Sequence, residues 1–352
     1  MMNRALICNI LPPDYLVKLK ASQAAFNFCE RLIDGGCFDD VRSITPFSYK
    51  LPKDISYKEI IFYINNGRGY LGKIIRYFVL NVKLAWDVRR CDRIWFYNLS
   101  ISSLLAYVIL RFLFLKRIYV IMADYTPASS RTSLQGIIGW LLERCEGMIS
   151  LSGRSCFKNV KKLKVKAGII DNEMLIRNKK VSDIDRVTFL FSGTLASVTG
   201  YDMALKVFAQ IPQAQLYISG NGSFPEQYRK YENIHFMGNM QYEDYLKLLN
   251  KSTICLNLRN PYLLENNNNF PSKILDYFSK GKIVLSTMQY SEIDGANYIY
   301  IPFEEQALIR SIKEILVIDN SELLKYSDNI LFIRQNFSVE SWKQTIQAVD
   351  SE

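Results

Sequence analysis

The chain has 352 residues, of which 49% are hydrophobic and 22% charged, and its net charge is +10. This composition is too apolar for a disordered chain and does not fit a collagen-like one, and the length predicts two domains. Seven cysteines, an odd number without a C-x-x-C pair, argue against a secreted disulfide scaffold and favour reduced thiols in the cytoplasm.

The positive charge is unevenly spread: residues 1–180 carry a net charge of +15 and residues 181–352 one of −5. A basic domain favours nucleic acid, an anionic membrane surface or a phosphate-bearing substrate. No secretory signal peptide is expected, because the first residues lead directly into a strand pattern. The apolar stretch 99–115 is short for a bilayer span and is interrupted by Arg111, so we interpret it as a buried crossover helix.

In the first half, short apolar runs alternate with segments of helical periodicity. Strands are predicted over residues 5–11, 60–64, 93–97, 117–122 and 147–151. Helices are predicted over residues 22–33, 70–90, 101–114 and 132–144. This alternation is typical of a doubly wound parallel sheet.

The charged stretch 171–186 lacks aromatic residues and is interpreted as an interdomain linker. After it, strands are predicted over residues 187–192, 215–219, 234–237, 253–258, 283–287 and 298–301. Helices are predicted over residues 200–210, 241–250, 272–280, 304–317, 321–335 and 338–350. The sequence therefore predicts an α/β protein with two Rossmann-like domains, residues 1–170 and 187–335. Residues 336–352 would pack back towards the first domain, and an interdomain cleft is the expected site.

The segment 270–282 has the features of an anion site at a helix start. Pro271 suits a first helical turn, and Gly281 suits a C-terminal cap. Ser272 and Lys273 would lie beside the free N–H groups of the first turn and could bind a diphosphate. Asp276, one turn further, could accept hydrogen bonds from ribose hydroxyls. The alternative is that Lys273 and Asp276 form only a helix-surface pair.

This segment resembles the donor-site signature of GT-B glycosyltransferases, specifically glycosyltransferase family 4 and its bacterial capsule and O-antigen members. Four further segments resemble that family in the same order, at residues 189–195, 200–202, 218–222 and 233–238. The resemblance covers residues 187–301 and is only topological over residues 1–186.

The resemblance implies a GT-B fold and a retaining, metal-independent transfer without a cofactor. The co-substrate would be a nucleotide-diphosphate sugar, and the acceptor a lipid-linked or other saccharide. It implies a cytoplasmic enzyme of surface polysaccharide synthesis, peripheral at the inner face of the plasma membrane. Asp276 stands at the position of a ribose ligand, and Gly193 would allow the donor to approach closely. Gly220 and Asn221 belong to a matching turn and are also donor-binding candidates.

Three positions depart from the family pattern. Asn268 replaces the first of two paired acids, which lies beside the donor sugar, and Thr194 and Thr199 replace an Arg and a Lys that grip the diphosphate. Lys273 and Arg259 could substitute for the lost cations. These losses motivate an alternative function, a non-catalytic GT-B-like module that scaffolds or activates a partner transferase.

Three features outside this segment allow more than one interpretation. Asp124 could orient the acceptor hydroxyl, or it could begin the turn before Pro127. His235 is interpreted as a packed or edge-strand histidine. No metal site is expected, because the chain has a single histidine and no cysteine pair. A nucleic-acid partner is not expected, because only charge supports it.

The predicted helix 70–90 combines an apolar stripe with a basic one. The apolar residues are Leu71, Ile74, Ile75, Phe78, Val79 and Val82, and the basic ones are Lys73, Arg76, Lys83 and Arg90. The favoured interpretation is a surface helix whose apolar stripe lies in the core. The alternative is a helix that lies on an anionic inner leaflet.

Overall fold

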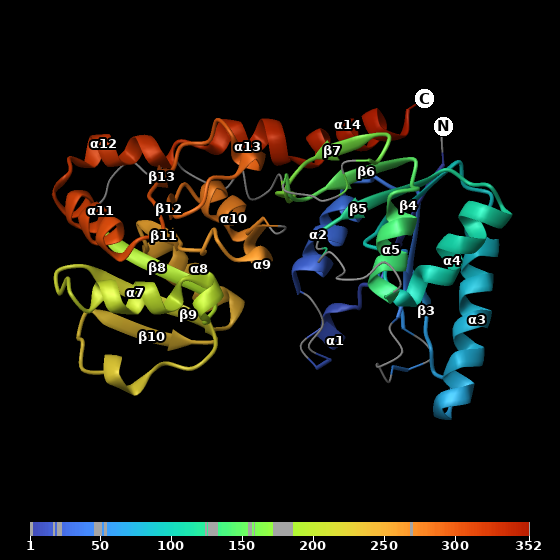
Figure 1. Ribbon diagram of the computed structural model, residues 1–352, viewed down its shortest axis with the longest axis horizontal. Helices are drawn as coiled ribbons and strands as arrows, with labels where there is room; N and C mark the ends of the chain where they lie inside the picture. The colour runs from blue at the N-terminus through green and yellow to red at the C-terminus, as the bar shows by residue number, and fades with distance from the viewer. Residues whose placement is uncertain are drawn as a thin grey trace. The chain divides into compact units, whose positions relative to one another are not determined.

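The computed structural model divides the chain into two compact units, which are described separately (Figure 1). Unit 1 comprises Met1–Ile169 and Val339–Glu352, and unit 2 comprises Ile170–Ser338. The structure describes residues 3–16, 18–19, 23–45, 51–52, 55–123, 125, 133–153, 157, 159–171, 186–267 and 270–351. The predicted linker therefore lies almost wholly outside the described residues.

The described strands of unit 1 form one parallel sheet with the order β3-β2-β1-β4-β5-β6-β7. They are β1 (Arg4–Cys8), β2 (Asp40–Ile44), β3 (Ile61–Tyr63), β4 (Arg93–Tyr97), β5 (Ile118–Met122), β6 (Gly147–Ser150) and β7 (Leu163–Val165). Every residue of β4 and β5 is buried, as expected of strands covered on both faces. The predicted strands are confirmed, and β2 and β7 are additional.

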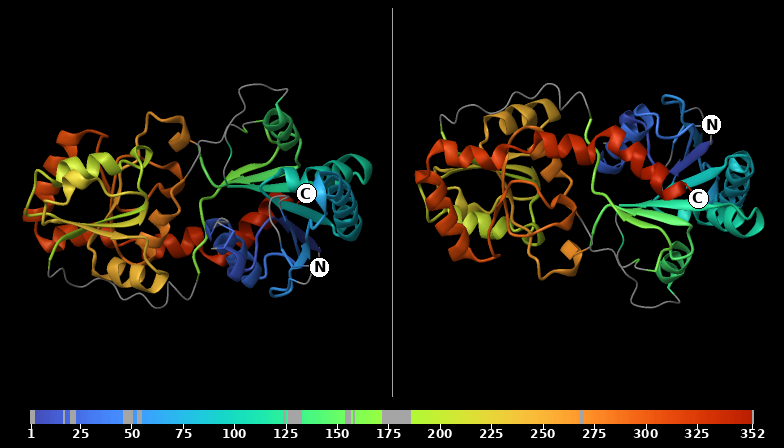
Figure 2. Two further views of the ribbon diagram at one scale, coloured as in Figure 1. Left: turned by 90° about the horizontal axis from the view of Figure 1, so that it is seen from below. Right: turned by 90° about the horizontal axis from the view of Figure 1, so that it is seen from above.

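Helices cover both faces of this sheet (Figure 2). They are α1 (Pro13–Leu16), α2 (Gln23–Asp34), α3 (Gly69–Val88), η1 (Ile101–Ser103), α4 (Leu104–Val108), the π-helix η2 (Ile109–Leu113), α5 (Leu134–Leu142) and α14 (Val339–Asp350). The apolar side chains of α3, α4 and α5 form one core, and those of α2 and α14 form the other. The fold is thus doubly wound, as the alternation predicted.

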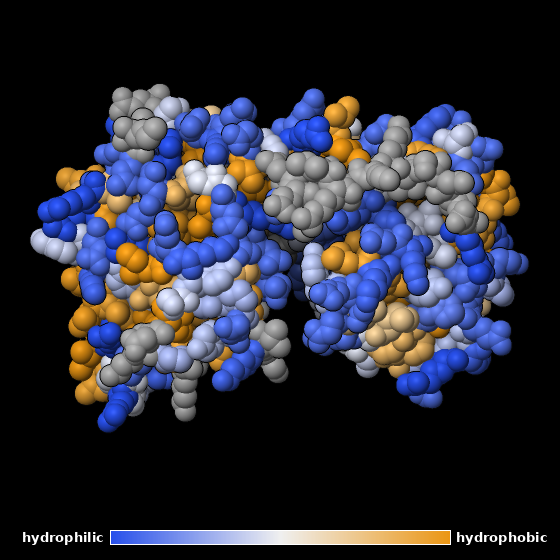
Figure 3. Space-filling view, turned by 180° about the vertical axis from the view of Figure 1, so that it is seen from behind, coloured by the Kyte–Doolittle hydropathy of each residue, from blue (hydrophilic) through white to orange (hydrophobic). Residues whose placement is uncertain are grey.

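The favoured interpretation of α3 was wrong. Its buried residues are Leu80, Asn81, Leu84, Ala85 and Val88. The predicted core residues Leu71, Ile75, Phe78, Val79 and Val82 are exposed. Figure 3 shows this hydrophobic surface at the left edge of its view, where α3 runs along unit 1. The stretch 99–115, predicted to form a buried crossover helix, is only partly buried, since Leu110 lies in the core and Leu113 is exposed. Among the described residues, each helix is too short or too polar for a membrane crossing.

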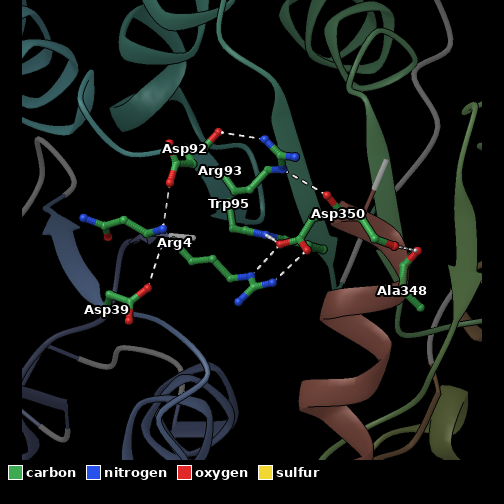
Figure 4. Close-up of polar contacts among 9 residues, drawn as sticks. Arg4, Asp39, Asp92, Arg93, Trp95, Ala348 and Asp350 are labelled. Carbon is green, nitrogen blue, oxygen red and sulfur yellow. Dashed lines mark hydrogen bonds and ion pairs between the residues drawn. The ribbon is translucent and has the colours of Figure 1, made fainter. Parts of the chain in front are cut away.

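Helix α14 is held in unit 1 by a buried ion pair (Figure 4). The Arg4 guanidinium donates from Nε to Asp350 Oδ2 at 2.7 Å and from Nη2 to Oδ1 at 3.0 Å. Trp95 Nε1 donates to the same Oδ2 at 3.2 Å, and Arg93 Nε donates to the backbone carbonyl of Asp350 at 2.9 Å. The carboxylate is completely buried. The last turn of α14 is therefore fixed to the amino-terminal ends of β1 and β4.

Unit 2 contains a second parallel sheet, with the order β10-β9-β8-β11-β12-β13 among its described strands. They are β8 (Thr188–Thr194), β9 (Gln215–Asn221), β10 (Ile234–Gly238), β11 (Ile254–Asn257), β12 (Ile283–Ser286) and β13 (Ile299–Tyr300). All six were predicted. The helices and helical turns are η3 (Ser197–Thr199), α7 (Tyr201–Phe208), η4 (Glu226–Tyr228), α8 (Tyr242–Lys251), α9 (Leu264–Asn267), α10 (Lys273–Ser279), η5 (Ser291–Ile293), α11 (Glu305–Val317), α12 (Asn320–Leu324), η6 (Lys325–Ser327) and α13 (Ile330–Phe337).

His235 lies on the edge strand β10, as predicted. Its Nε2 is 2.9 Å from Gln215 Oε1, and its ring stacks on Tyr217 with the ring centroids 4.6 Å apart. Because these contacts are made between neighbouring strands, the histidine serves the packing of the sheet surface.

Candidate functional site

The carboxyl ends of β8 and β9 meet without side chains between them. In the parallel register Gly193 is opposite Gly220, and Thr194 is opposite Asn221. A Cβ atom on Gly220 would lie 1.7 Å from the carbonyl oxygen of Gly193, so no other residue fits there. The two strand ends therefore pack closely against each other, and both glycines are half-buried at the edge of the sheet where Rossmann-like domains bind their ligands.

Lys273, the first residue of α10, extends over the end of β8. Its Nζ donates a hydrogen bond to Ser192 Oγ at 3.2 Å. A Cβ atom on Gly193 would be 3.8 Å from the same Nζ, so the ammonium lies beside the bare backbone of that glycine. The structure therefore brings together two residues, Gly193 and Lys273, that are 80 positions apart in the sequence.

Two tyrosines complete the surroundings of this lysine. Ser192 Oγ is 2.8 Å from the hydroxyl of Tyr277 and 3.2 Å from that of Tyr245. The ring of Tyr245 also lies under the ammonium of Lys273, with Nζ 5.5 Å from the ring centroid. Burial raises the pKa of both tyrosines, so their hydroxyls stay protonated at neutral pH.

The ammonium of Lys273 is poorly solvated, and its nearest charges among the described residues compensate it only in part. Burial lowers its pKa from the ordinary value of 10.5, and the nearby Asp276 carboxylate only partly opposes this effect. In the part of the chain that the structure describes, no carboxylate pairs with Lys273 within 4.0 Å. An anion brought to this position would regain the electrostatic stabilisation that burial removes.

The two other candidates on this segment lie next to Lys273. Ser272 is exposed and its side chain makes no capping hydrogen bond, while Asp276 is half-buried one turn further along α10. Pro271 precedes the helix, and its carbonyl accepts a hydrogen bond from Ile274 N at 3.0 Å. The helix thus begins one residue later than predicted, with Ser272 at its N-cap.

Arg259 lies in a separate cluster behind the end of β11. Its Nη1 donates to Asn266 Oδ1 at 3.3 Å, and Asn266 Nδ2 in turn donates to the carbonyls of Val198 and Asn260 at 3.0 and 2.9 Å. The cluster therefore holds the loop after β8 to the loop after β11. Arg259 remains half-buried, with its guanidinium engaged by an uncharged amide.

Thr194 and Thr199, the two threonines that replace cations of the family pattern, have different environments. Thr199 Oγ1 lies within hydrogen-bonding distance of two backbone carbonyls of its own loop, those of Thr194 at 2.8 Å and Ala196 at 2.6 Å. The Thr194 side chain is exposed. Thr199 thus shapes the loop that follows β8.

The two catalytic candidates, Asp124 and Asn268, lie outside the described residues. Sequence reasoning also missed three residues of the site. Tyr277 could have been found, because it lies four positions after Lys273 and so on the same side of the helix. Ser192 could have been found as the neighbour of Gly193, whereas no sequence signal connects Tyr245 with them.

Comparison with protein families finds a similarity that lies in the second unit. Residues 172–328 match the family described as "Glycosyl transferases group 1". The match covers most of unit 2 and less than half of the chain. The matched residues include both the Lys273 cluster and the Arg259 cluster. No curated protein matches the sequence at a significant level.

Solved structures resemble both units together. Anabaena HepE in complex with UDP and glucose has a TM-score of 0.68 at 18% identity, covering 99% of each chain. Sucrose-phosphate synthase from Thermosynechococcus elongatus has a TM-score of 0.66 at 13% identity, covering 99% of this chain and 98% of the other. The lipopolysaccharide outer core galactosyltransferase WaaB has a TM-score of 0.65 at 14% identity, covering 99% of each. At these identities the similarity establishes the two-domain GT-B fold alone. Support for glycosyl transfer comes from the family match.

Proposed function

We propose that the chain transfers a sugar from a nucleotide-diphosphate donor, bound by unit 2, to a saccharide acceptor. The observation that carries this proposal is the half-buried ammonium of Lys273, which has no paired carboxylate within 4.0 Å among the described residues and lies beside the half-buried backbone of Gly193. A diphosphate is the ligand that such a place suits best, because it supplies the missing negative charge and accepts hydrogen bonds from backbone N–H groups.

In this proposal the residues of the site bind different parts of the donor. Lys273 and Ser272 contact the diphosphate, and Asp276 accepts hydrogen bonds from the ribose hydroxyls. The backbone of Gly220 and the side chain of Asn221 contact the donor at the strand ends. Arg259 lies behind the loop after β8 and adds positive charge to the donor side. When the glycosidic bond breaks, the departing diphosphate gains charge, and a fixed ammonium stabilises that charge without having to reorganise.

The remaining parts of the proposal concern the acceptor and the course of the reaction. Transfer would proceed with retention and without a metal, the donor phosphate taking the proton of the acceptor hydroxyl. Asp124 would orient that hydroxyl, and Asn268 would lie beside the donor sugar. The acceptor would be a lipid-linked saccharide of bacterial surface polysaccharide synthesis, reached by unit 1 from the inner face of the membrane. Two similar structures support the donor and the pathway: one holds UDP and glucose, and another is a lipopolysaccharide galactosyltransferase.

Calorimetric titration of the full chain with UDP, GDP and their sugar conjugates tests the proposal and identifies the donor. Asp276→Ala separates the two halves of the site. It should weaken binding of the preferred nucleoside diphosphate at least tenfold, equivalent to the loss of one hydrogen-bonded carboxylate. It should leave the affinity for inorganic pyrophosphate within a factor of about two, because pyrophosphate has no ribose.

The alternative function is a non-catalytic module that activates a partner transferase. It is favoured by the loop after β8, where Thr194 and Thr199 stand in place of two cations and the Thr199 hydroxyl bonds its own loop. A folded chain that binds none of the nucleotides or conjugates, alone or with saccharide acceptors, would support this alternative.

A further inference from the structure

Helix α3 has a second apolar face that the protein does not cover. Its residues are Leu71, Ile75, Phe78, Val79, Val82 and Trp86, which are 50–69% exposed. Their spacing places all six on one side of the helix, away from the buried residues Leu80, Leu84 and Val88. Burial in the core of unit 1 therefore cannot account for their hydrophobic character.

Ring contacts extend this face beyond α3. Trp86 contacts Phe114, with the ring centroids 6.3 Å apart, and Phe112 stacks on Trp140 of α5 at 6.5 Å. Leu113, which lies between Phe112 and Phe114 in the sequence, and Ile137 and Leu134 of α5 are also exposed. We call this surface the α3–α5 face. It consists of the six α3 residues together with Phe112, Leu113, Phe114, Leu134, Ile137 and Trp140.

Cations border the α3–α5 face. The guanidinium of Arg89 lies over the ring of Trp86 at 3.4 Å from its centroid, and that of Arg144 lies over Trp140 at 3.7 Å. Arg76 and Lys83 of α3 are seven residues apart and so share one flank of the apolar residues. Together with Arg90, which lies just beyond the end of the helix, they form a basic stripe. Both tryptophans thus present an apolar ring with a positive charge fixed to it.

The charge of unit 1 decides between possible occupants of this face. Unit 1 contains 27 Lys and Arg residues against 15 Asp and Glu residues, a net charge of +12. A second copy would bring two basic borders against each other, and like charges in contact oppose association. An anionic bilayer surface offers phosphate groups to the cations and acyl chains to the apolar residues.

We propose that the α3–α5 face docks unit 1 on an anionic phospholipid surface, with α3 lying in the plane of the interface. Trp86 and Trp140 insert at the depth of the headgroups, a position that suits their amphipathic rings. Arg89, Arg144 and the basic stripe contact lipid phosphates. This inference specifies the membrane contact of the proposed function and rests on that function for its biological role.

Cosedimentation with two kinds of vesicle tests the docking surface. One kind consists of phosphatidylcholine alone, and the other contains 30% phosphatidylglycerol in addition. The full chain should bind only the anionic vesicles, and NaCl should weaken the binding. The double variant Arg76→Gln/Lys83→Gln should lower the affinity about 25-fold, at about a factor of five for each cation. Phe78→Gln/Val82→Gln should lower it at least tenfold. The control variant Val317→Gln/Leu331→Gln removes exposed apolar residues of unit 2 and should bind like the wild type.

Quenching by lipids brominated near the headgroup tests the depth of insertion. Trp86 and Trp140 are exposed, whereas Trp95 and Trp342 are buried, so quenching should disappear in Trp86→Phe/Trp140→Phe. Equal vesicle binding by all variants would overturn the proposal. The proposal would also be overturned if the chain bound no vesicles but self-associated, and if Phe78→Gln/Val82→Gln abolished that self-association. This result would assign the face to a second copy. Nucleotide titration of the same preparations is independent of vesicles, so a failure of the docking surface can be distinguished from a failure of the proposed transferase function.

Discussion

Replacing Asp350 by Asn should destabilise unit 1 strongly, although the two side chains have nearly the same shape. Arg4 donates to both carboxylate oxygens, from Nε to Oδ2 and from Nη2 to Oδ1. Whichever way the new amide is turned, its NH₂ group faces one of these donors, and the guanidinium loses its counter-charge. Breaking a fully buried pair in this way costs about 3–5 kcal/mol. Because the Arg4 side chain is 17% exposed and can recruit water, we expect about 2–3 kcal/mol.

The chain offers a selective assay for this effect. All four tryptophans lie in unit 1, at positions 86, 95, 140 and 342, so tryptophan fluorescence reports the unfolding of that unit alone. In urea, Asp350→Asn should lower the free energy of unfolding by about 2–3 kcal/mol, which corresponds to a melting temperature roughly 5–10 °C lower for a unit of this size. Glu340→Gln removes an exposed ion pair on the same helix, with Lys343 3.9 Å away, and should cost less than about 0.5 kcal/mol. Equal stabilities of the two variants would refute the reasoning.

Two further predictions concern single positions. Gly220→Ala should lower the free energy of unfolding of unit 2 by more than about 3 kcal/mol, because the new Cβ would overlap the Gly193 carbonyl. Unit 2 should then unfold at a lower urea concentration. Circular dichroism should detect the loss while the fluorescence transition of unit 1 is unchanged, and Gly72→Ala, where the nearest atom is 3.6 Å away, should be tolerated. Burial lowers the pKa of Lys166 from 10.5 to about 8. Between these values the unfolded chain keeps a proton that the folded chain has released, so stability should rise with pH. The stability of the wild type relative to Lys166→Met should thus rise by on the order of 2 kcal/mol between pH 8 and 10.5, and a flat difference would contradict the assignment.

The sequence predicted the architecture because most strands of a doubly wound sheet are continuous apolar runs. It failed where strands depart from that composition. In β2 (Asp40–Ile44), Arg42 lies in the strand because it pairs with Asp40 and Asp87. In β7 (Leu163–Val165), a three-residue edge strand contains Lys164. Neither the ion pairs nor the edge position could be known before the fold.

The error on α3 has a different cause. Helical periodicity identifies which residues share a side of the helix, but α3 has two apolar sides. Leu84 and Val88 on one side are buried, and Phe78 and Val82 on the other are exposed. Only the position of the sheet decides which side enters the core.

Part of the candidate site could be predicted from the topology of the sheet. Gly193 lies near the carboxyl end of β8 and Lys273 begins α10, and in a parallel sheet strand ends and helix starts meet at the same edge. Their proximity therefore followed from the topology. The hydroxyls of Ser192 and Tyr245 join them through tertiary packing of α8 against β8. That contact has no counterpart in local sequence pattern.

The most direct test of the central claim is the affinity of the full chain for its preferred nucleoside diphosphate, compared between Lys273→Met and Lys280→Met. Both lysines belong to the α10 segment, but only Lys273 lies over Gly193. Loss of a charge-assisted contact with a diphosphate should weaken binding about a hundredfold in Lys273→Met, while Lys280→Met should bind like the wild type. Equal affinities in the two variants would contradict the assignment of the diphosphate to the end of β8.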